Sequence, residues 1–508
     1  MRIERLFALR TLLIVSLVAG CASCVAAQQT TAESVIRSAD LLSDVQTLRR
    51  AYETLHPGLY RYNTKAQIDT AFTALNREFD HDRTLKEAFL AISVFLNKIK
   101  CGHTYANPLN QPKTTANALF KGDDKVPFYF RWLGERMVVT RGLGTAQMLP
   151  RGTEIVSING NSAAAILAKL MLVARADGSN DAKRRAYLEV TGLDRYEAFD
   201  IYFPMFFPQS SPRLDLVIRR PGSKRNENTT VDAMTDDERA AFLPSSAKAD
   251  PSAPVFSFKY LDSHSALLTM PTWALFNSKW NWRRFIDTSI DDAIAKGVTD
   301  LVIDIRENEG GLDVGDAIVS RIADREIRTT SIRRLVRYRQ IPTDLKPFLD
   351  TWDRSFDNWG PAAVGPSADG YYTLTKYDDE PGGNVIKPSG RRFTGKVYVL
   401  TSPVNSSATF QFAQLVKENK LATLIGRPTG GSQRGINGGA FYFLSLPKSG
   451  IEADLPLIGQ FPTVPKPDAG ITPDIYVQAT IADIVAGRDP ELDLVRKLIS
   501  DRNPQGRN

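Results

Sequence analysis

The chain has 508 residues, of which 43% are hydrophobic and 24% charged. This composition is close to the globular average, and it excludes a wholly disordered, fibrous or multi-span membrane protein. At roughly 100–200 residues per domain, the length predicts two to four domains. The formal charge of +7 is spread over the whole chain, which argues against a nucleic-acid partner. Three cysteines, two of them near the N-terminus, predict no disulfide framework.

Residues 1–27 have the layout of a secretory signal: an arginine-containing start, an apolar run and then small residues. The apolar run is too short to span a bilayer. A cut before Gln28 would follow the small-x-small rule, whereas V-A-G-C at 18–21 resembles a lipoprotein box in which Cys21 would be lipidated. Either alternative predicts an exported protein, periplasmic or secreted, and lipidation would anchor it to a membrane. No second membrane span is expected.

Residues 33–100 are predicted to form helices, because their apolar side chains recur every three or four positions. We therefore place an N-terminal helical domain at 28–115. Residues 118–220 change to short strands with a strong turn signal at Asn159-Gly160, which predicts a small β-rich module. Its expected strands are 138–140, 154–158 and 214–218, and its expected helix is 163–173.

The polar stretch 221–254 is predicted to be a linker. From 255 onward strands and helices alternate, which indicates a largely parallel sheet in an α/β domain at 255–490. Residues 325–392 interrupt this order and are interpreted as an irregular insertion, and 491–508 as a C-terminal tail. The expected strands are 266–270, 300–305, 396–401 and 421–425, and the expected helices are 285–296, one that ends at 322, and 408–418.

Ser407 is a candidate nucleophile. It lies just after a buried strand and at the start of a helix, and α/β proteins place ligands at that edge of the sheet. The N–H of Ala408, in the first helical turn, could bind an oxyanion. A serine at a helix start is more often only an N-cap. Ser402 and Ser406 are neighbouring competitors.

Two further segments could complete a hydrolytic site. Gly310-Gly311 follows a predicted strand and could supply a second oxyanion donor, although a tight turn is the simpler interpretation. His103 is one of four histidines and lies in a glycine-containing turn, so it is a candidate general base; a surface or capping role is the simpler alternative. Cys101 is interpreted as a small buried residue. No HExxH motif and no clustered set of histidines and aspartates occurs, so no metal is expected.

Four motifs in the second half resemble, in their order, those of the tail-specific (carboxyl-terminal processing) serine peptidase family. They are DIRENEGG at 304–311, SATFQFA at 407–413, GRPTGG at 426–431 and GITPDI at 470–475. In addition, LPRGTEIVSING at 149–160 is similar to the core of the PDZ-like module that such peptidases carry. The resemblance implies an α/β, crotonase-like (ClpP/crotonase-type) catalytic domain, accompanied by the N-terminal helical domain and by a PDZ-like module at 118–220.

The resemblance also implies a mechanism. One branch of the family uses a Ser-Lys dyad, but the position of its lysine is Ser432 here, and Arg434 cannot deprotonate. The chain instead resembles the tricorn-core branch, which has a Ser-His-acid triad with its histidine in a turn like C-G-H-T at 101–104. That branch usually has a glutamate just before the closing motif, where this chain has Asp468. The implied roles are Ser407 as nucleophile, His103 as base, Asp468 as acid, and Gly311 and Ala408 as oxyanion donors, with Glu452 and Asp474 as alternative acids.

The sequence therefore predicts an exported serine peptidase that acts on a peptide or protein substrate through an acyl-enzyme, without metal or organic cofactor. Two alternatives stay open. The same fold is used by a retinoid-binding protein, so a non-catalytic protein that binds apolar ligands is one of them. Because a triad does not fix the acyl group, an esterase is the other. The sequence does not define the oligomeric state.

Overall fold

The computed structural model describes residues 30–243, 250–329, 332–378 and 384–502. The predicted signal at 1–27, including Cys21, lies outside these residues. Within them, no helix is both long enough and apolar enough to cross a membrane.

A six-stranded sheet forms the α/β half of the molecule. Its strand order is β22-β19-β18-β11-β10-β9, and all neighbours run parallel except β9 and β10. The central strands are almost wholly apolar because helices cover both faces of the sheet. The strands are β9 (Ser257–Tyr260), β10 (Ser265–Thr269), β11 (Asp300–Asp304), β18 (Lys396–Thr401), β19 (Thr423–Gly426) and β22 (Ile475–Tyr476).

Alternate residues of these strands face different helices. Ile303 points into a core shared with α9, α10 and α11, whereas Val302 on the other face packs in a cluster with Val495 and Ile499 of α13. The expectation of a C-terminal tail at 491–508 is therefore corrected, because an apolar stripe makes most of that segment a helix on the sheet. The helices of this half are α9 (Trp282–Ala295), α10 (Val314–Ile322), α11 (Ser407–Glu418), α12 (Ile481–Ala486) and α13 (Pro490–Arg502).

A second, antiparallel sheet has the order β14-β20-β21-β13-β16-β15. Residues 325–392 are not simply an irregular insertion, because four of their strands complete this sheet around the long β20–β21 hairpin. The strands are β13 (Ile332–Val336), β14 (Leu349–Asp350), β15 (Ala363–Val364), β16 (Tyr372–Leu374), β20 (Asn437–Ser445) and β21 (Glu452–Pro462); a small separate ladder pairs β12 (Ile327–Arg328) with β17 (Val385–Ile386).

The β-rich unit contains an antiparallel sheet of order β3-β4-β5-β7-β8, with β6 paired to β5. The predicted linker at 221–254 is corrected here, since β8 pairs with β7 along its whole length and α8 follows. The elements are β3 (Phe128–Leu133), β4 (Arg136–Gly142), β5 (Glu154–Ile158), β6 (Asn161–Ser162), β7 (Arg213–Arg219), β8 (Glu227–Asp232), α5 (Ala163–Leu170), α6 (Asp181–Tyr187), α7 (Ala198–Phe206) and α8 (Asp236–Ala240).

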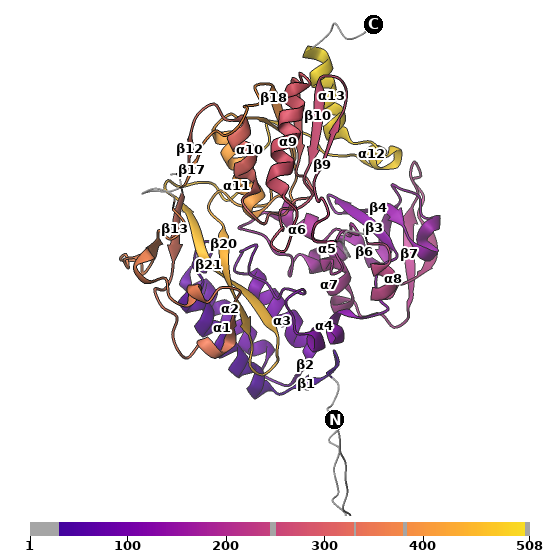
Figure 1. Ribbon diagram of the computed structural model, residues 1–508. Coiled ribbons are helices and arrows are strands. Elements are labelled where there is room, and N and C mark those ends of the chain that lie inside the picture. Colours follow the sequence, from indigo (N-terminus) through magenta and orange to yellow (C-terminus); the bar gives the residue numbers. More distant parts are fainter. Residues whose placement is uncertain (1–29, 244–249, 330–331, 379–383, 503–508) are drawn as a thin grey trace, which may run out of the picture.

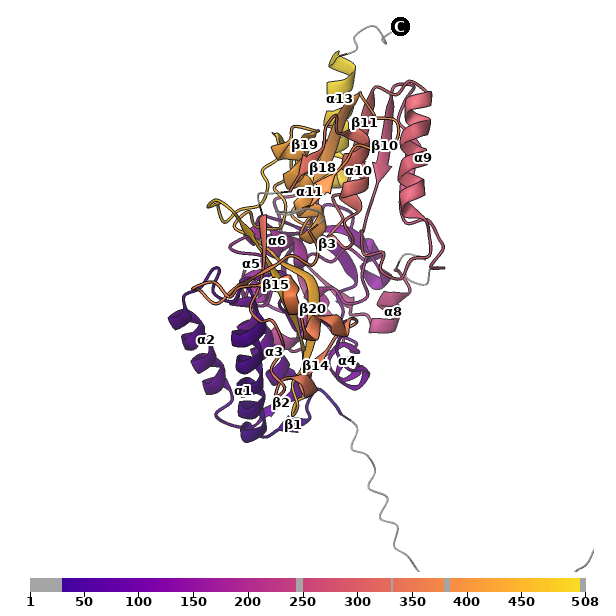
Figure 2. The same cartoon turned by 60° about the vertical axis from the view of Figure 1, so that its left-hand side comes forward.

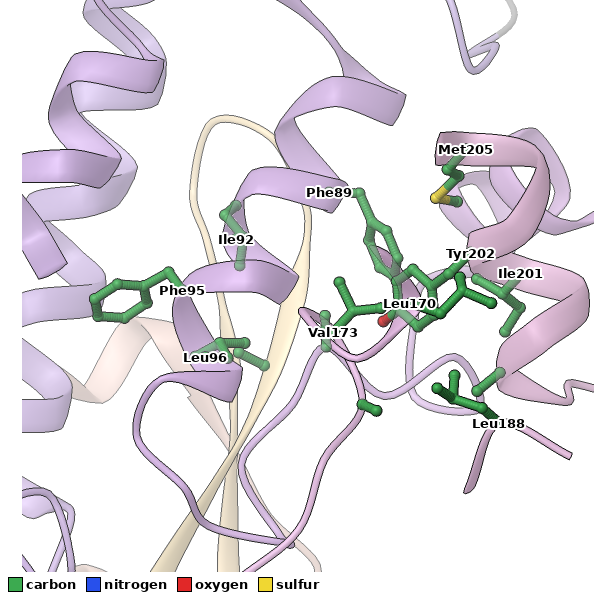
Figure 3. Close-up of a cluster of buried hydrophobic side chains, with 14 of the residues drawn as sticks. Phe89, Ile92, Phe95, Leu96, Leu170, Val173, Leu188, Ile201, Tyr202 and Met205 are labelled. Atoms are coloured by element: carbon green, nitrogen blue, oxygen red, sulfur yellow. The ribbon is translucent and has the colours of Figure 1, made fainter. Parts of the chain in front are cut away.

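The N-terminal helices begin at good caps: Thr64 and Thr84 each form a capping box. These helices do not have a core of their own, which corrects the expectation of a separate domain at 28–115. Figure 3 shows Phe89 and Leu96 facing the same cluster as Tyr202 of α7, and this core continues into the β20–β21 hairpin. The elements are α1 (Ser38–Leu55), α2 (Lys65–Glu78), α3 (Leu85–Asn97), α4 (Lys113–Phe120) and the ladder of β1 (Val35–Ile36) with β2 (Arg83–Thr84).

Three regions meet around the β20–β21 hairpin. In Figure 1 the N-terminal helices lie at the bottom, the β-rich unit at the right and the parallel sheet with its helices at the top. Figures 1 and 2 agree that the hairpin lies between the N-terminal helices and α11. The carboxyl ends of β11 and β18 are thereby brought towards residues from the first half of the chain.

Candidate active site

Ser407 begins α11 in a strained conformation. Its φ is +50°, in the left-handed region that residues with a Cβ atom rarely adopt. Gly310 lies directly beside it, because a Cβ atom at that position would be only 2.8 Å from Ser407 Cβ. A strained turn between a strand and a helix is also how α/β hydrolases present a nucleophilic serine. The half-buried Ser407 hydroxyl is therefore held at the carboxyl edge of the parallel sheet.

The two competing serines are committed to structural hydrogen bonds. Ser402 Oγ donates to the carbonyl oxygen of Arg306 at 2.5 Å, and Ser406 Oγ donates to that of Glu309 at 3.1 Å. Among the described residues, Ser407 Oγ has no hydrogen-bond partner. Of the three serines, Ser407 alone offers an uncommitted hydroxyl.

Two backbone N–H groups lie near this hydroxyl without a partner in the described part of the chain. They belong to Gly311 and Ala408. Gly310 N instead donates to Asn308 Oδ1 at 3.0 Å. The φ of Gly311 is +137°, and a Cβ atom there would be 2.0 Å from the carbonyl oxygen of Trp273, so only glycine fits. Such a pair of N–H groups can stabilise an oxyanion, as the sequence analysis expected of these two residues.

His103 lies in the turn after α3, with its ring centroid 5.6 Å from that of Phe441 in β20. Burial lowers the pKa of His103 below its usual value, and the negative charge of Asp177 opposes this shift. The imidazole is therefore neutral at neutral pH, which is the form that a general base requires. His56 has a different role: its Nε2 is 2.8 Å from Thr104 Oγ1, and burial lowers its pKa to about 3.

An ion cluster connects the histidine turn to the nucleophile loops. Arg175 donates to the carbonyl oxygen of Gly102 at 2.7 Å and to the Glu309 carboxylate at 3.0 and 3.1 Å. Lys183 also donates to Glu309, and to the carbonyl oxygen of Val404 at 3.1 Å. Partial burial opposes ionisation of Glu309, but Arg175 and Lys183 lower its pKa to about 2. Glu309 is therefore ionised at neutral pH.

No hydrogen bond joins Ser407 to His103 within the described ranges. In enzymes without bound substrate, catalytic hydrogen bonds are often long and shorten only in the substrate complex. The Arg175–Glu309 pair brings the two segments into one neighbourhood, because Gly102 precedes His103 and Glu309 precedes Gly310.

Asp468, the acid expected from the sequence, is bonded to other groups than His103. Its carboxylate accepts hydrogen bonds from Ser179 N, at 3.1 and 3.2 Å, and from Ser432 Oγ at 3.0 Å. It is also pressed against Gly178, where a Cβ atom would lie 1.8 Å from Asp468 Oδ1. Asp468 thus fixes the turn at 177–179, and it occupies the surroundings of Ser432, the place of the family's lysine.

Asp177, which the sequence analysis missed, lies next to the histidine turn. Its side chain is buried, and Oδ1 accepts a hydrogen bond from Gly102 N at 3.0 Å. Its other oxygen, Oδ2, is buried without a partner, and so is Nδ1 of His103. Burial raises the pKa of Asp177, and the charge of His103 is the first influence that lowers it. A carboxylate oxygen and an imidazole nitrogen that could carry a proton therefore both lie buried and unsatisfied beside the histidine turn.

The two alternative acids have other roles. Glu452 lies at the end of the β20–β21 hairpin remote from Asn437, beside Ser445. Asp474 pairs with Lys417 at 2.9 Å and accepts a hydrogen bond from Leu424 N.

The part of the chain that contains Ser407 matches a known protein family. Residues 264–477 match the description "Peptidase family S41", and they include Ser407 and the free N–H groups of Gly311 and Ala408. Residues 264–477 belong to peptidase family S41. The protein is accordingly a serine peptidase.

Solved structures extend the likeness of this S41 peptidase beyond the matched segment. The structure of mature CPAF complexed with lactacystin is 16% identical in sequence to this chain. The match covers 91% of this chain and 98% of that one, and its TM-score is 0.61. A second structure of mature CPAF is 15% identical and also has a TM-score of 0.61, with 93% and 99% covered. The photosystem II D1 C-terminal processing protease is 13% identical over 86% and 93% of the chains, with a TM-score of 0.40. No curated protein sequence matches the chain.

A metal site was not expected for this peptidase. Across the described ranges, no group of three or more histidine, cysteine, aspartate and glutamate side chains could hold a metal ion.

Proposed function

We propose that the protein hydrolyses peptide bonds through an acyl-enzyme formed on Ser407. His103 takes the proton of the hydroxyl as Oγ attacks the carbonyl carbon, and it then gives that proton to the leaving amine. The N–H groups of Gly311 and Ala408 bind the oxygen that becomes negative. Water then attacks the acyl-enzyme by the same route and restores Ser407. The observation that carries this proposal is the strained, uncommitted Ser407 beside two unpartnered N–H groups.

The group that orients His103 is the second part of the proposal. The sequence gives this role to Asp468, whereas the contacts favour Asp177, whose free Oδ2 would accept the proton on His103 Nδ1. That hydrogen bond would leave Nε2 as the base and would stabilise the imidazolium. In this arrangement Asp468 acts as a positioning residue, since it holds the turn that carries Asp177 through Ser179 N.

The finer architecture and the location are proposals as well. We infer that the six-stranded parallel sheet and its helices form a crotonase-like (ClpP/crotonase-type) catalytic domain, and that the sheet β3-β4-β5-β7-β8 with α5 forms a PDZ-like module. Export is proposed from residues 1–27 alone, with cleavage before Gln28 or lipidation of Cys21. The proposed partner is a peptide or protein substrate.

A fluorophosphonate probe tests the proposed chemistry, because it reacts only with an activated serine. We expect one covalent label, located by mass spectrometry on the peptide that contains Ser407. Hydrolysis of casein in preference to p-nitrophenyl butyrate supports a peptidase, whereas the reverse preference indicates an esterase. A folded protein that takes no label and cleaves neither compound would instead be a non-catalytic binding protein, and the proposal would be wrong.

Cys101 is expected to have no part in the chemistry. The thiol is buried and accepts a hydrogen bond from Asn437 Nδ2 at 3.2 Å, and burial raises its pKa to about 11. It is therefore protonated and unreactive at neutral pH. Cys101→Ser should keep kcat/KM for casein peptides close to the wild-type value, with a loss of stability of about 1 kcal/mol. Peptidase assays and thermal unfolding check this, and an inactive but folded variant would contradict it.

A further inference from the structure

A positively charged cavity of about 560 Å³ opens beside the active site. Phe461 forms part of its wall, and Asp468 places it next to the turn at 177–179. Its charged lining residues are Arg61, Arg333, Arg434, Lys466 and Asp468.

The cavity wall is bonded to the nucleophile helix. Gln411 lies one helical turn after Ser407 in α11, and its Nε2 donates to Gln460 Oε1 at 2.5 Å. The carbonyl oxygen of Gln460 accepts a hydrogen bond from Arg61 Nη2 at 3.0 Å. Gln460 thus links the helix that begins at Ser407 to Arg61 of the cavity.

Arg61 is the central feature of the cavity. Only 7% of it is exposed, and its Cζ lies 4.1 Å from the centroid of the Phe461 ring. Gly435 provides the space on another side, because a Cβ atom there would come within 3.0 Å of Cζ. Two guanidinium nitrogens, Nε and Nη1, have no hydrogen-bond partner. Both nitrogens are closed off from the cavity, but a buried charge that lacks a counter-ion is unfavourable, so the negative charge of an anion nearby in the cavity would stabilise this arginine.

The cavity lining has more positive than negative side chains, and most of the positive ones have no carboxylate partner in the described part of the chain. Arg333 and Arg434 are exposed, and neither pairs with a carboxylate among the described residues. Lys466 has a partner in Glu418 at 3.3 Å. The one acidic group, Asp468, is occupied by Ser179 and Ser432. Three arginines thus line one space, and the exposed guanidinium groups of Arg333 and Arg434 can bind a carboxylate with two parallel hydrogen bonds.

We propose that this cavity is a subsite for a carboxylate of the substrate, so that the peptidase selects acidic peptides. The inference rests on the proposed function and specifies its substrate class. The carboxylate has two possible sources, an aspartate or glutamate side chain near the scissile bond or the C-terminus of the peptide. Both would be held by the same guanidinium groups, and both are screened by salt near the surface.

Binding can be measured separately from hydrolysis with the Ser407→Ala variant. It is incubated with decapeptide pools in which one position is fixed as glutamate or as glutamine, each pool made with a free or an amidated C-terminus. Bound peptides are quantified by mass spectrometry. We expect at least about tenfold enrichment of the pools that carry the carboxylate at one position. Enrichment at an internal position identifies a side chain, and enrichment of the free acids alone identifies the C-terminus.

Variants of the cavity decide whether these residues cause the preference. Arg333→Gln combined with Arg434→Gln changes exposed side chains only, and should reduce the enrichment to less than about threefold; Arg61→Gln should do the same if it folds. Arg283→Gln, an exposed arginine of α9, is the matched control and should leave the enrichment unchanged.

The outcomes separate this inference from the proposed function. Equal capture of glutamate and glutamine pools, free and amidated, overturns the carboxylate subsite even if the wild-type protein cleaves casein. A preference that survives loss of Arg333 and Arg434 also overturns it. A preference that requires these arginines in a protein that cleaves nothing would uphold the subsite and contradict only the peptidase chemistry.

Discussion

Ser407→Ala is expected to lower kcat by on the order of 10⁴-fold or more. Without Oγ no acyl-enzyme forms, and the N–H groups of Gly311 and Ala408 can stabilise only direct attack by water. The variant should fold normally, since Ser407 Oγ makes no hydrogen bond to the described residues. Single-turnover assays with a fluorogenic peptide, together with circular dichroism, measure both properties.

Two control variants make this result specific to Ser407. Ser406→Ala loses the hydrogen bond to the carbonyl oxygen of Glu309, and should reduce stability by about 1 kcal/mol while it keeps most of the activity. Ser407→Gly should be as inactive as Ser407→Ala but more stable by about 1 kcal/mol, because glycine accepts the φ of +50° without strain. An inactive Ser406→Ala with an active Ser407→Ala would move the nucleophile to Ser406.

Asp177→Asn is expected to lower kcat by on the order of 10⁴-fold, as the same exchange does in another triad. The carboxamide keeps the volume of the side chain, but it favours the wrong imidazole tautomer and cannot stabilise imidazolium. Asp468→Asn should cost at most about 10²-fold, the scale of an indirect displacement. Its side-chain oxygen can still accept a hydrogen bond from Ser179 N, so the turn at 177–179 should survive.

The pH profile distinguishes these two roles. The charge of Asp177 raises the pKa of His103 against the effect of burial, so its removal lowers that pKa. The acid limb of kcat/KM, where activity is lost as His103 is protonated, should therefore move to lower pH in Asp177→Asn. It should not move in Asp468→Asn. A deep loss of activity and a shifted limb in Asp468→Asn, with a near-normal Asp177→Asn, would restore the assignment made from the sequence.

The strands of the parallel sheet could be predicted from the sequence because helices bury both of their faces. The strands predicted at 300–305 and 396–401 therefore stand out by the apolar runs 301–303 and 397–400. The β20–β21 hairpin was missed because its sequence contains residues that usually interrupt strands. It contains Gly438-Gly439, where the register shifts, and a proline at 456 within β21, and both features are typical of loops in a single sequence.

Some residues of the candidate site could be found from the sequence, and one could not. Ser407, Gly311 and Ala408 lie in motifs whose strand-to-helix context is local, so local sequence made them candidates, and the resemblance to the peptidase family assigned their roles. Asp177 lies in the polar stretch R-A-D-G-S-N, which is typical of a surface turn. Its burial and its contact with Gly102 arise only when 177–179 packs between the histidine turn and Asp468. No spacing rule could have found it.

The position of the β20–β21 hairpin also determines when this enzyme can first act. Tyr52 in α1 donates to the carbonyl oxygen of Asp454 at 2.8 Å, and the N-terminal helices share one core with the hairpin. The helices that carry the histidine turn are synthesised first, yet they complete their packing only when residues beyond 450 have left the ribosome. In the proposed mechanism, a nascent chain therefore carries its general base long before it has a nucleophile to activate. The proposed site would be complete only after both segments have been synthesised and have packed around the hairpin.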